Sequence, residues 1–151
     1  SAETAAVHAK LIREKGPDYS QAVLDTVGPG AFITSGALLK AQQARTLITK
    51  GMNEVLQNVD VLLTPAVPMV AWPLGNEGMR DLGNTVVEVF NRLAYTMAAF
   101  NLTGHPAISV PCGLSAEGLP IGLQISGRAF DEETVLRVAH VYEQLEPPLR
   151  L

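Results

Sequence analysis

The chain is short of charged residues, which make up 17% of its 151 positions, against about 25% in a typical soluble domain. Hydrophobic residues account for 47%. This composition indicates that part of the surface of the chain is buried against another polypeptide segment. That segment could be the rest of a larger domain or a second copy of the chain in a homo-oligomer. The net charge is −4 and no Lys/Arg cluster is present, which argues against nucleic acid or an anionic membrane surface as a partner.

Cysteine is nearly absent as well. The single Cys112 excludes an internal disulfide framework and favours a reducing, cytoplasmic location. No apolar run approaches the length of a membrane span, and the N-terminal residues do not form a signal peptide. His8, His105 and His140 are too scattered for a metal site, and no phosphate-binding glycine loop is present. The sequence therefore implies no metal and no organic cofactor.

Apolar residues recur at helical spacing in four stretches. The expected helices cover Ala2–Lys15, a long segment from an N-cap at Ser35 along an apolar stripe to Val59, a segment from Asn84 or Thr85 to Phe100, and a C-terminal segment that follows an N-cap at Asp131. Around that last cap, Phe130 and Val135 have the spacing of a hydrophobic staple. Residues 18–33 contain Gly-Pro-Gly and predict a connecting loop.

Three short runs are typical of strands. Asp60–Thr64 is nearly all apolar, which favours a strand covered on both faces. Ala107–Val110 and Ile121–Ile125 are β-branched runs joined by a loop over Gly113–Pro120, whereas Pro65–Gly83 predicts a long loop. The three strands do not obviously form one contiguous sheet. We therefore expect an α/β fold in which helices pack on a few strands of a larger mixed sheet, part of which is absent from this chain.

One segment carries a specific pattern. Residues 101–113 are Asn-Leu-Thr-Gly-His-Pro-Ala-Ile-Ser-Val-Pro-Cys-Gly, and residues 118–124 are Gly-Leu-Pro-Ile-Gly-Leu-Gln. Together with Asp60–Pro68, this pattern closely resembles the C-terminal part of the amidase-signature enzymes, which are serine hydrolases that cleave carboxamides. The resemblance extends from about Ser35 to Leu145. It implies that residues 1–151 are a single C-terminal segment of an amidase-signature domain.

The resemblance also implies a mechanism that needs residues absent from this chain. Amidase-signature enzymes use a Ser nucleophile, a second Ser joined through a cis peptide, and a Lys base, and they need no metal or organic cofactor. No Gly-Gly-Ser-Ser-Gly-like segment is present here. The lysines lie on the polar sides or at the ends of the expected helices, whereas a Lys base must be desolvated; they are Lys10, Lys15, Lys40 and Lys50. We therefore expect no catalytic residue in this chain, which would be inactive without the missing N-terminal half of the domain.

In the proteins that the chain resembles, the helix before the Asn-Leu-x-Gly phrase lines the substrate pocket. This implies substrate contacts from Leu93, Ala94 and Met97, with Tyr95 and Trp72 as further candidates. Leu93 and Met97 share one helical face, although plain core packing explains that spacing equally well. The glutaminase subunits of the family have, in the position of Ala94, an aspartate that holds the amino group of glutamine. Its absence implies a less polar amide as substrate.

Two alternatives remain open. The chain could be a stand-alone, non-catalytic interaction module that kept the amidase half-fold and binds a partner. A thiol hydrolase built on Cys112 and His105 is a more distant alternative, because these residues flank one short strand and would be roughly 20 Å apart at ~3.3 Å per residue. An inert, packed thiol is the ordinary state of a lone cysteine, and we expect it for Cys112.

Overall fold

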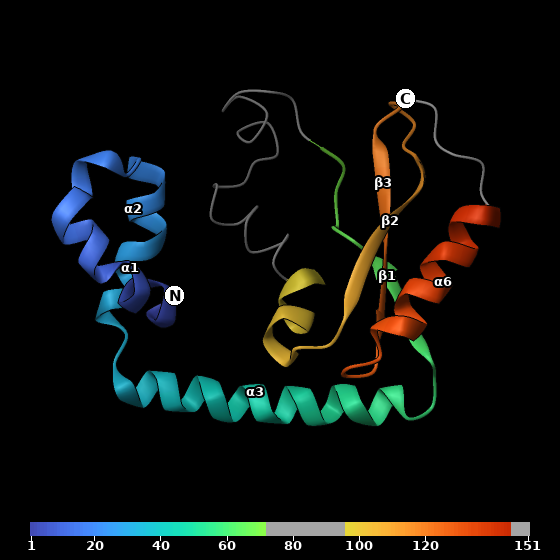
Figure 1. Cartoon of the computed structure of the whole chain (residues 1–151), viewed down its shortest axis with the longest axis horizontal. Helices are drawn as coiled ribbons and strands as arrows, with labels where there is room; N and C mark the ends of the chain where they lie inside the picture. The colour runs from blue at the N-terminus through green and yellow to red at the C-terminus, as the bar shows by residue number, and fades with distance from the viewer. Residues whose placement is uncertain (72–95, 146–151) are drawn as a thin grey trace. The chain divides into compact units, whose positions relative to one another are not determined.

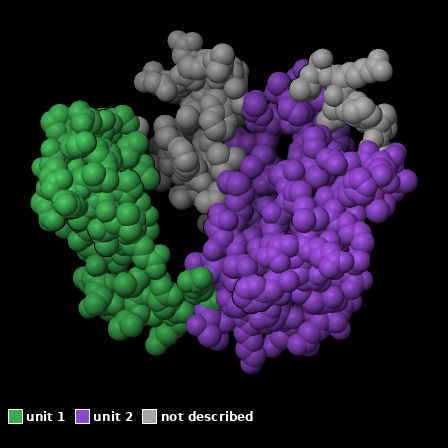
Figure 2. All heavy atoms as spheres, viewed as in Figure 1, with its two compact units in different colours: residues 1–45 green, residues 46–151 purple. Residues whose placement is uncertain are grey.

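The computed structural model describes residues 1–71 and 96–145 (Figure 1). These residues belong to two compact units, Ser1–Arg45 and Thr46–Leu151, which Figure 2 shows in different colours. Within the described ranges, no helix combines the length and the apolar character that crossing a membrane requires.

The first unit consists of short helices. Helix α1 covers Ala2–Lys15 and ends at Gly16, as the sequence predicts. The prediction of a loop over residues 18–33 is wrong, because helix α2 forms over Gln21–Val27. Short 3-10 helices lie on either side of it, at Gly16–Asp18 and Gly28–Phe32. The Ser20 side chain caps α2 by accepting a hydrogen bond from the backbone N–H of Val23 at 3.4 Å. A helix of seven residues is too short to show a convincing 3.6-residue period, so its sequence resembles a loop.

Helix α3 covers Ser35–Leu56. Its N-cap is Thr34 rather than the expected Ser35, since Oγ1 of Thr34 accepts a hydrogen bond from the backbone N–H of Ala37 at 3.2 Å. Only Leu56 of this helix is buried, and the expected apolar stripe faces solvent in this chain; Leu38 is 38% exposed, Ile48 44% and Val55 49%. Val59 lies beyond the end of the helix. Most of the length of α3 therefore has no apolar cover from the described residues.

The three strands form one antiparallel sheet in the order β1-β3-β2. Strand β1 covers Val61–Pro65, β2 Ala107–Leu114 and β3 Pro120–Gly127. Leu63 on β1 and Ile108 on β2 both pair with Ile125 on the central strand. The described strands are therefore contiguous, contrary to expectation. The prediction that both faces of β1 are buried is also wrong, because the side chain of Leu63 is 58% exposed.

Helix α6 covers Glu132–Leu145 and packs against the sheet (Figure 1). Its expected N-cap is confirmed, because Oδ1 of Asp131 accepts a hydrogen bond from the backbone N–H of Thr134 at 3.3 Å. The core joins Val135 and Ala139 of α6 to Ile125 and Val110 of the sheet. The expected staple is absent: Phe130 has a φ of 62° and its side chain is 95% exposed, so it does not pack on the buried Val135. A left-handed backbone at this position turns the chain sharply into the helix.

A further helix covers residues 96–103 and precedes β2. It is the described end of the helix expected from residue 84 or 85, and it continues three residues past the expected end at Phe100. The start of that expected helix and residues 72–83 of the expected loop lie outside the described residues. Phe100 is buried and anchors this helix in the second unit.

Candidate functional site

Met97 is the one pocket candidate that lies within the described residues. It lies on the helix described over residues 96–103, and its side chain is 40% exposed. Leu93, Ala94, Tyr95 and Trp72 lie outside the described residues. Met97 is therefore not a plain core residue in this chain, and an exposed thioether side chain offers a flexible apolar contact surface.

A buried glutamine holds this turn against the sheet. Gln124 on the central strand β3 is only 7% exposed. Its Nε2 donates to Oγ1 of Thr64 on β1 at 3.0 Å and to the backbone carbonyl of Thr96 at 3.3 Å. The Thr96 hydroxyl in turn donates to the carbonyl of Ala66 at 3.0 Å. Strands β1 and β3 and residue Thr96 of the helix that carries Met97 are thus joined through one set of side-chain hydrogen bonds.

The chain just after β1 closes this set of bonds. The backbone N–H of Ala66 donates to the carbonyl of Gly122 on β3 at 2.8 Å. A Cβ at position 122 would lie 2.9 Å from Cβ of Ala66 and 3.0 Å from Oγ of Ser109. Only glycine lets the segment after β1 approach β3 so closely. The sequence Gly-Leu-Gln therefore has two structural roles. Gly122 lets the segment after β1 lie close to β3, and the side chain of Gln124 hydrogen-bonds to Thr64 and to Thr96.

His105 is a second buried polar group, only 6% exposed. Its Nε2 lies 3.0 Å from Oδ1 of Asn53 on α3, and its Nδ1 lies 2.8 Å from Oγ1 of Thr103. Burial lowers the pKa of His105 below its ordinary value of 6.5, so the neutral ring is favoured. The ring of His105 therefore joins α3, through Asn53, to the end of the helix over residues 96–103, through Thr103.

Cys112 is exposed, so the expected packed thiol is wrong. It lies on β2 beside the irregular register between Pro111 and Gly113. That irregularity interrupts the alternation of the strand, which a short apolar run gives no reason to expect. The nitrogens of His105 contact Asn53 and Thr103 rather than a sulfur atom, which argues against a thiol–imidazole pair.

The described lysines are poorly suited to act as a base. Each of the four is exposed, and two form ion pairs with Glu one helical turn away, Lys10–Glu14 and Lys50–Glu54, both at 3.9 Å. The desolvation that a Lys base needs is therefore missing at these positions. Over residues 1–71 and 96–145, no cluster of three or more His, Cys, Asp or Glu side chains could hold a metal ion.

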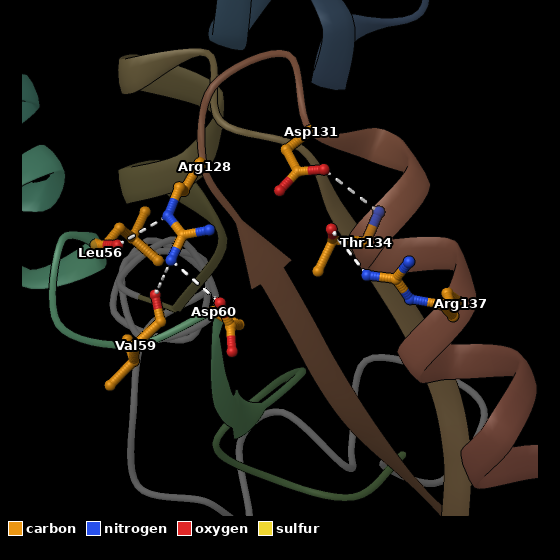
Figure 3. Close-up of polar contacts among 7 residues, drawn as sticks. All are labelled: Leu56, Val59, Asp60, Arg128, Asp131, Thr134 and Arg137. Atoms are coloured by element: carbon orange, nitrogen blue, oxygen red, sulfur yellow. Dashed lines mark hydrogen bonds and ion pairs between the residues drawn. The ribbon is translucent and has the colours of Figure 1, made fainter.

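Arg128 fastens the end of α3 to the sheet (Figure 3). Its Nε donates to the carbonyl of Leu56 at 2.9 Å, and its Nη2 donates to the carbonyl of Val59 and to Oδ1 of Asp60, both at 3.0 Å. A guanidinium at this place satisfies the carbonyl of Leu56, which the helix end leaves without an intrahelical partner, and a carbonyl of the segment that follows the helix. Figure 3 also shows the capped start of α6, where Asp131 accepts from Thr134.

Sequence reasoning missed Gln124, Thr64 and Thr96 as a group. A signal for Gln124 was present, because it is a polar residue inside a run of apolar strand residues. A buried amide needs partners, and their distance in sequence, 60 positions for Thr64 and 28 for Thr96, hides them from any local pattern.

Comparisons with known proteins agree on one family. The family model described as Amidase matches residues 7–136. The glutamyl-tRNA(Gln) amidotransferase A-type subunit of Brevibacillus brevis is 44% identical over 149 residues, which are 95% of this chain and 29% of that relative. The crystal structure of the same amidotransferase subunit from Thermotoga maritima gives a TM-score of 0.68 at 30% identity, over 94% of this chain and 28% of that one. A crystal structure described as an amidase gives 0.78 at 26% identity, over 97% and 33%. The chain thus spans about a third or less of the length of these proteins.

Proposed function

Because the chain belongs to the amidase family, we propose that it forms the C-terminal part of a serine amidohydrolase that cleaves carboxamide C–N bonds. In this proposal a Ser hydroxyl attacks the amide carbonyl, the amine leaves, and water hydrolyses the acyl-enzyme ester. The Ser nucleophile, its cis-linked Ser partner and the Lys base come from a segment outside this chain. The chain supplies part of the sheet and one wall of the acyl pocket.

The single observation that carries this proposal is the 44% identity to an amidotransferase subunit over a stretch that covers only 29% of it. The exposure of the four lysines supports a Lys base that comes from outside this chain, because a Lys base must be desolvated. We therefore propose that the chain alone does not hydrolyse amides.

The pocket wall is proposed to include Met97, an exposed residue of the helix that Gln124 anchors. Leu93, Ala94, Tyr95 and Trp72 are proposed to join it on the strength of the family resemblance. Since Ala94 stands where the glutaminase subunits have an aspartate, we propose an amide less polar than glutamine as the substrate. The single Cys112, an exposed thiol, suits a reducing compartment, which favours the cytoplasm as the location.

The test begins with the coding sequence upstream of Ser1. The proposal expects an in-frame Lys and a Gly/Ser-rich signature segment there, and the longer protein should release amine from simple aryl or alkyl amides. A stop codon and a ribosome-binding site close to Ser1 would contradict the proposal and favour the non-catalytic interaction module. Amide hydrolysis by the purified 151-residue chain, surviving further purification, would contradict its proposed inactivity.

The substrate proposal has a test of its own in the longer protein. Rates are compared for glutamine and for amides with apolar acyl groups, first with Ala94 and then in the Ala94→Asp variant. We expect the unaltered protein to prefer the apolar amides, and the variant to shift its preference towards glutamine. A protein that already prefers glutamine with Ala94 in place would overturn the substrate class while leaving the amidase proposal intact.

A further inference from the structure

The buried Gln124 has a role that extends the proposed function, on which this inference rests. We propose that Gln124 is a positioning residue: it fixes the turn that carries Met97 on the sheet, and thereby sets how well the pocket accepts an apolar acyl group. It acts through Thr96 and Met97.

The orientation of the Gln124 amide follows from its partners. The backbone carbonyl of Thr96 can only accept a hydrogen bond, so the nitrogen end of the Gln124 amide must face it, at 3.3 Å. The same nitrogen has a second proton, which it donates to Oγ1 of Thr64 at 3.0 Å. Both protons of one buried NH2 group are thus used, one on β1 and one on the helix over residues 96–103.

Thr96 is held at a second point. Its hydroxyl donates to the carbonyl of Ala66 at 3.0 Å, and the N–H of Ala66 donates to the carbonyl of Gly122 on β3 at 2.8 Å. Residue 96 is therefore fixed through its main chain and through its side chain, by the central strand and by the segment after β1. Met97 follows directly in the chain, so a shift of the Thr96 peptide carries Met97 with it.

An apolar residue would fill the Gln124 position more simply. Burying an amide group is costly unless its hydrogen bonds are made, and an isosteric apolar side chain avoids that cost. Only the amide provides a hydrogen-bond donor for the Thr96 backbone carbonyl. This hydrogen bond favours one position of the helix on the sheet over others. Since the side chain of Met97 in that turn is 40% exposed, the placement of the helix determines where this apolar side chain meets the substrate.

The test uses Gln124→Glu, which keeps the shape of the side chain but turns an ionised oxygen towards the Thr96 carbonyl. In the 151-residue chain we expect amide hydrogen exchange over residues 96–103 to become about tenfold faster at neutral pH, as for the loss of one good hydrogen bond. In the longer protein we expect kcat/KM for apolar amides to fall about tenfold, mostly through a higher KM. Acidification should partly reverse both effects, because burial raises the pKa of the new carboxyl and its protonated form can donate again.

The matched control is Gln144→Glu, the same change at an exposed position of α6. It should leave exchange over residues 96–103, KM and the pH profile unchanged. If Gln124→Glu does not fold, Thr64→Val takes its place, because it removes one acceptor of the Gln124 amide and keeps a β-branched residue on β1. We expect changes in the same direction and about threefold in size.

The outcomes separate this inference from the proposed function. A longer protein that hydrolyses no amide with Gln124 in place overturns the proposed function, and the exchange experiment still decides whether Gln124 positions the helix. Unchanged exchange over residues 96–103 overturns the positioning role. Faster exchange together with an unchanged KM and pH profile in an active enzyme overturns the role in selectivity.

Discussion

Nε2 of His105 lies 3.0 Å from Oδ1 of Asn53, which joins side chains 52 positions apart and ties α3 to the residue pair that leads into β2. The other ring nitrogen is 2.8 Å from Oγ1 of Thr103, whose hydroxyl donates to the carbonyl of Ala99. The imidazole thus bridges two helices from a buried position. A group of this kind makes the stability of the second unit depend on pH.

Because burial lowers the pKa of His105 in the folded chain below 6.5, the unfolded chain binds more protons as the pH falls. The contribution of the neutral ring to the free energy of unfolding is complete above pH 6.5 and is lost as the pH drops towards the folded pKa. Urea unfolding at a series of pH values should show this decline, and His105→Gln should show less of it. The control is His140→Gln on the exposed face of α6. Equal pH slopes for His105→Gln and the parent chain would contradict the assignment.

Arg128 is expected to stabilise the second unit through main-chain carbonyls rather than through its ion pair. Arg128→Met keeps the apolar stem and removes the bonds to the carbonyls of Leu56 and Val59, so the free energy of unfolding should fall by about 1–2 kcal/mol. Asp60→Asn should cost less than about 0.5 kcal/mol, because the Asp60 side chain is 80% exposed. Chemical denaturation measures both. A larger loss from Asp60→Asn than from Arg128→Met would reverse this ranking; Arg137→Met, at an exposed ion pair on α6, serves as control.

Two glycines are expected to respond to alanine with opposite signs. Gly122→Ala places a methyl group 2.9 Å from Cβ of Ala66, so it should destabilise the fold by about 1–3 kcal/mol. Gly51→Ala lies within α3 with no atom within 4 Å of the new Cβ, so it should stabilise the fold by about 0.5–1 kcal/mol. Thermal or urea unfolding compares them. Ala66→Gly should restore part of the stability that Gly122→Ala removes, and a failure to do so would show that Ala66 is not the obstacle.

The exposed thiol of Cys112 should react with an aromatic disulfide reagent in the folded chain. Its rate should be close to that of the chain in denaturant, because no unfolding step is needed. Cys112→Ser should leave the stability within about 0.5 kcal/mol of the parent, as expected for a surface substitution. Slow labelling that accelerates only in denaturant would show that the thiol is covered in solution.

The elements with strong local signals could be predicted from the sequence. Helix α1 carries its own stop at Gly16-Pro17, the start of α6 has Asp131 as a cap, and the β2–β3 hairpin is bounded by glycine and proline. Helix α2 was missed because seven residues beside Gly28-Pro29-Gly30 carry too few helical repeats to outweigh the turn signals.

The failures that concern the site have a different cause, since they depend on residues far apart in the chain. The staple between Phe130 and Val135 did not form because the backbone of Phe130 takes a left-handed conformation. The exposure of Cys112 and the partners of Gln124 follow from strand pairing and helix placement. Of the pocket candidates, Met97 lies on the anchored helix, and the assignment of all five to the pocket stays a prediction.

The strand order β1-β3-β2 also bears on how the sheet assembles. Strands β2 and β3 are joined by a tight turn in which the N–H of Ser115 donates to the carbonyl of Leu119. Val61 of β1, in contrast, pairs with Gly127, which is far away in the sequence. Closing the short hairpin costs less chain entropy than closing the long segment, by about 0.6 kcal/mol for each doubling of length. We therefore expect the β2–β3 hairpin to form first. Pairing of β1, which is distant in sequence, with the other edge of β3 should then be the step that limits the folding rate.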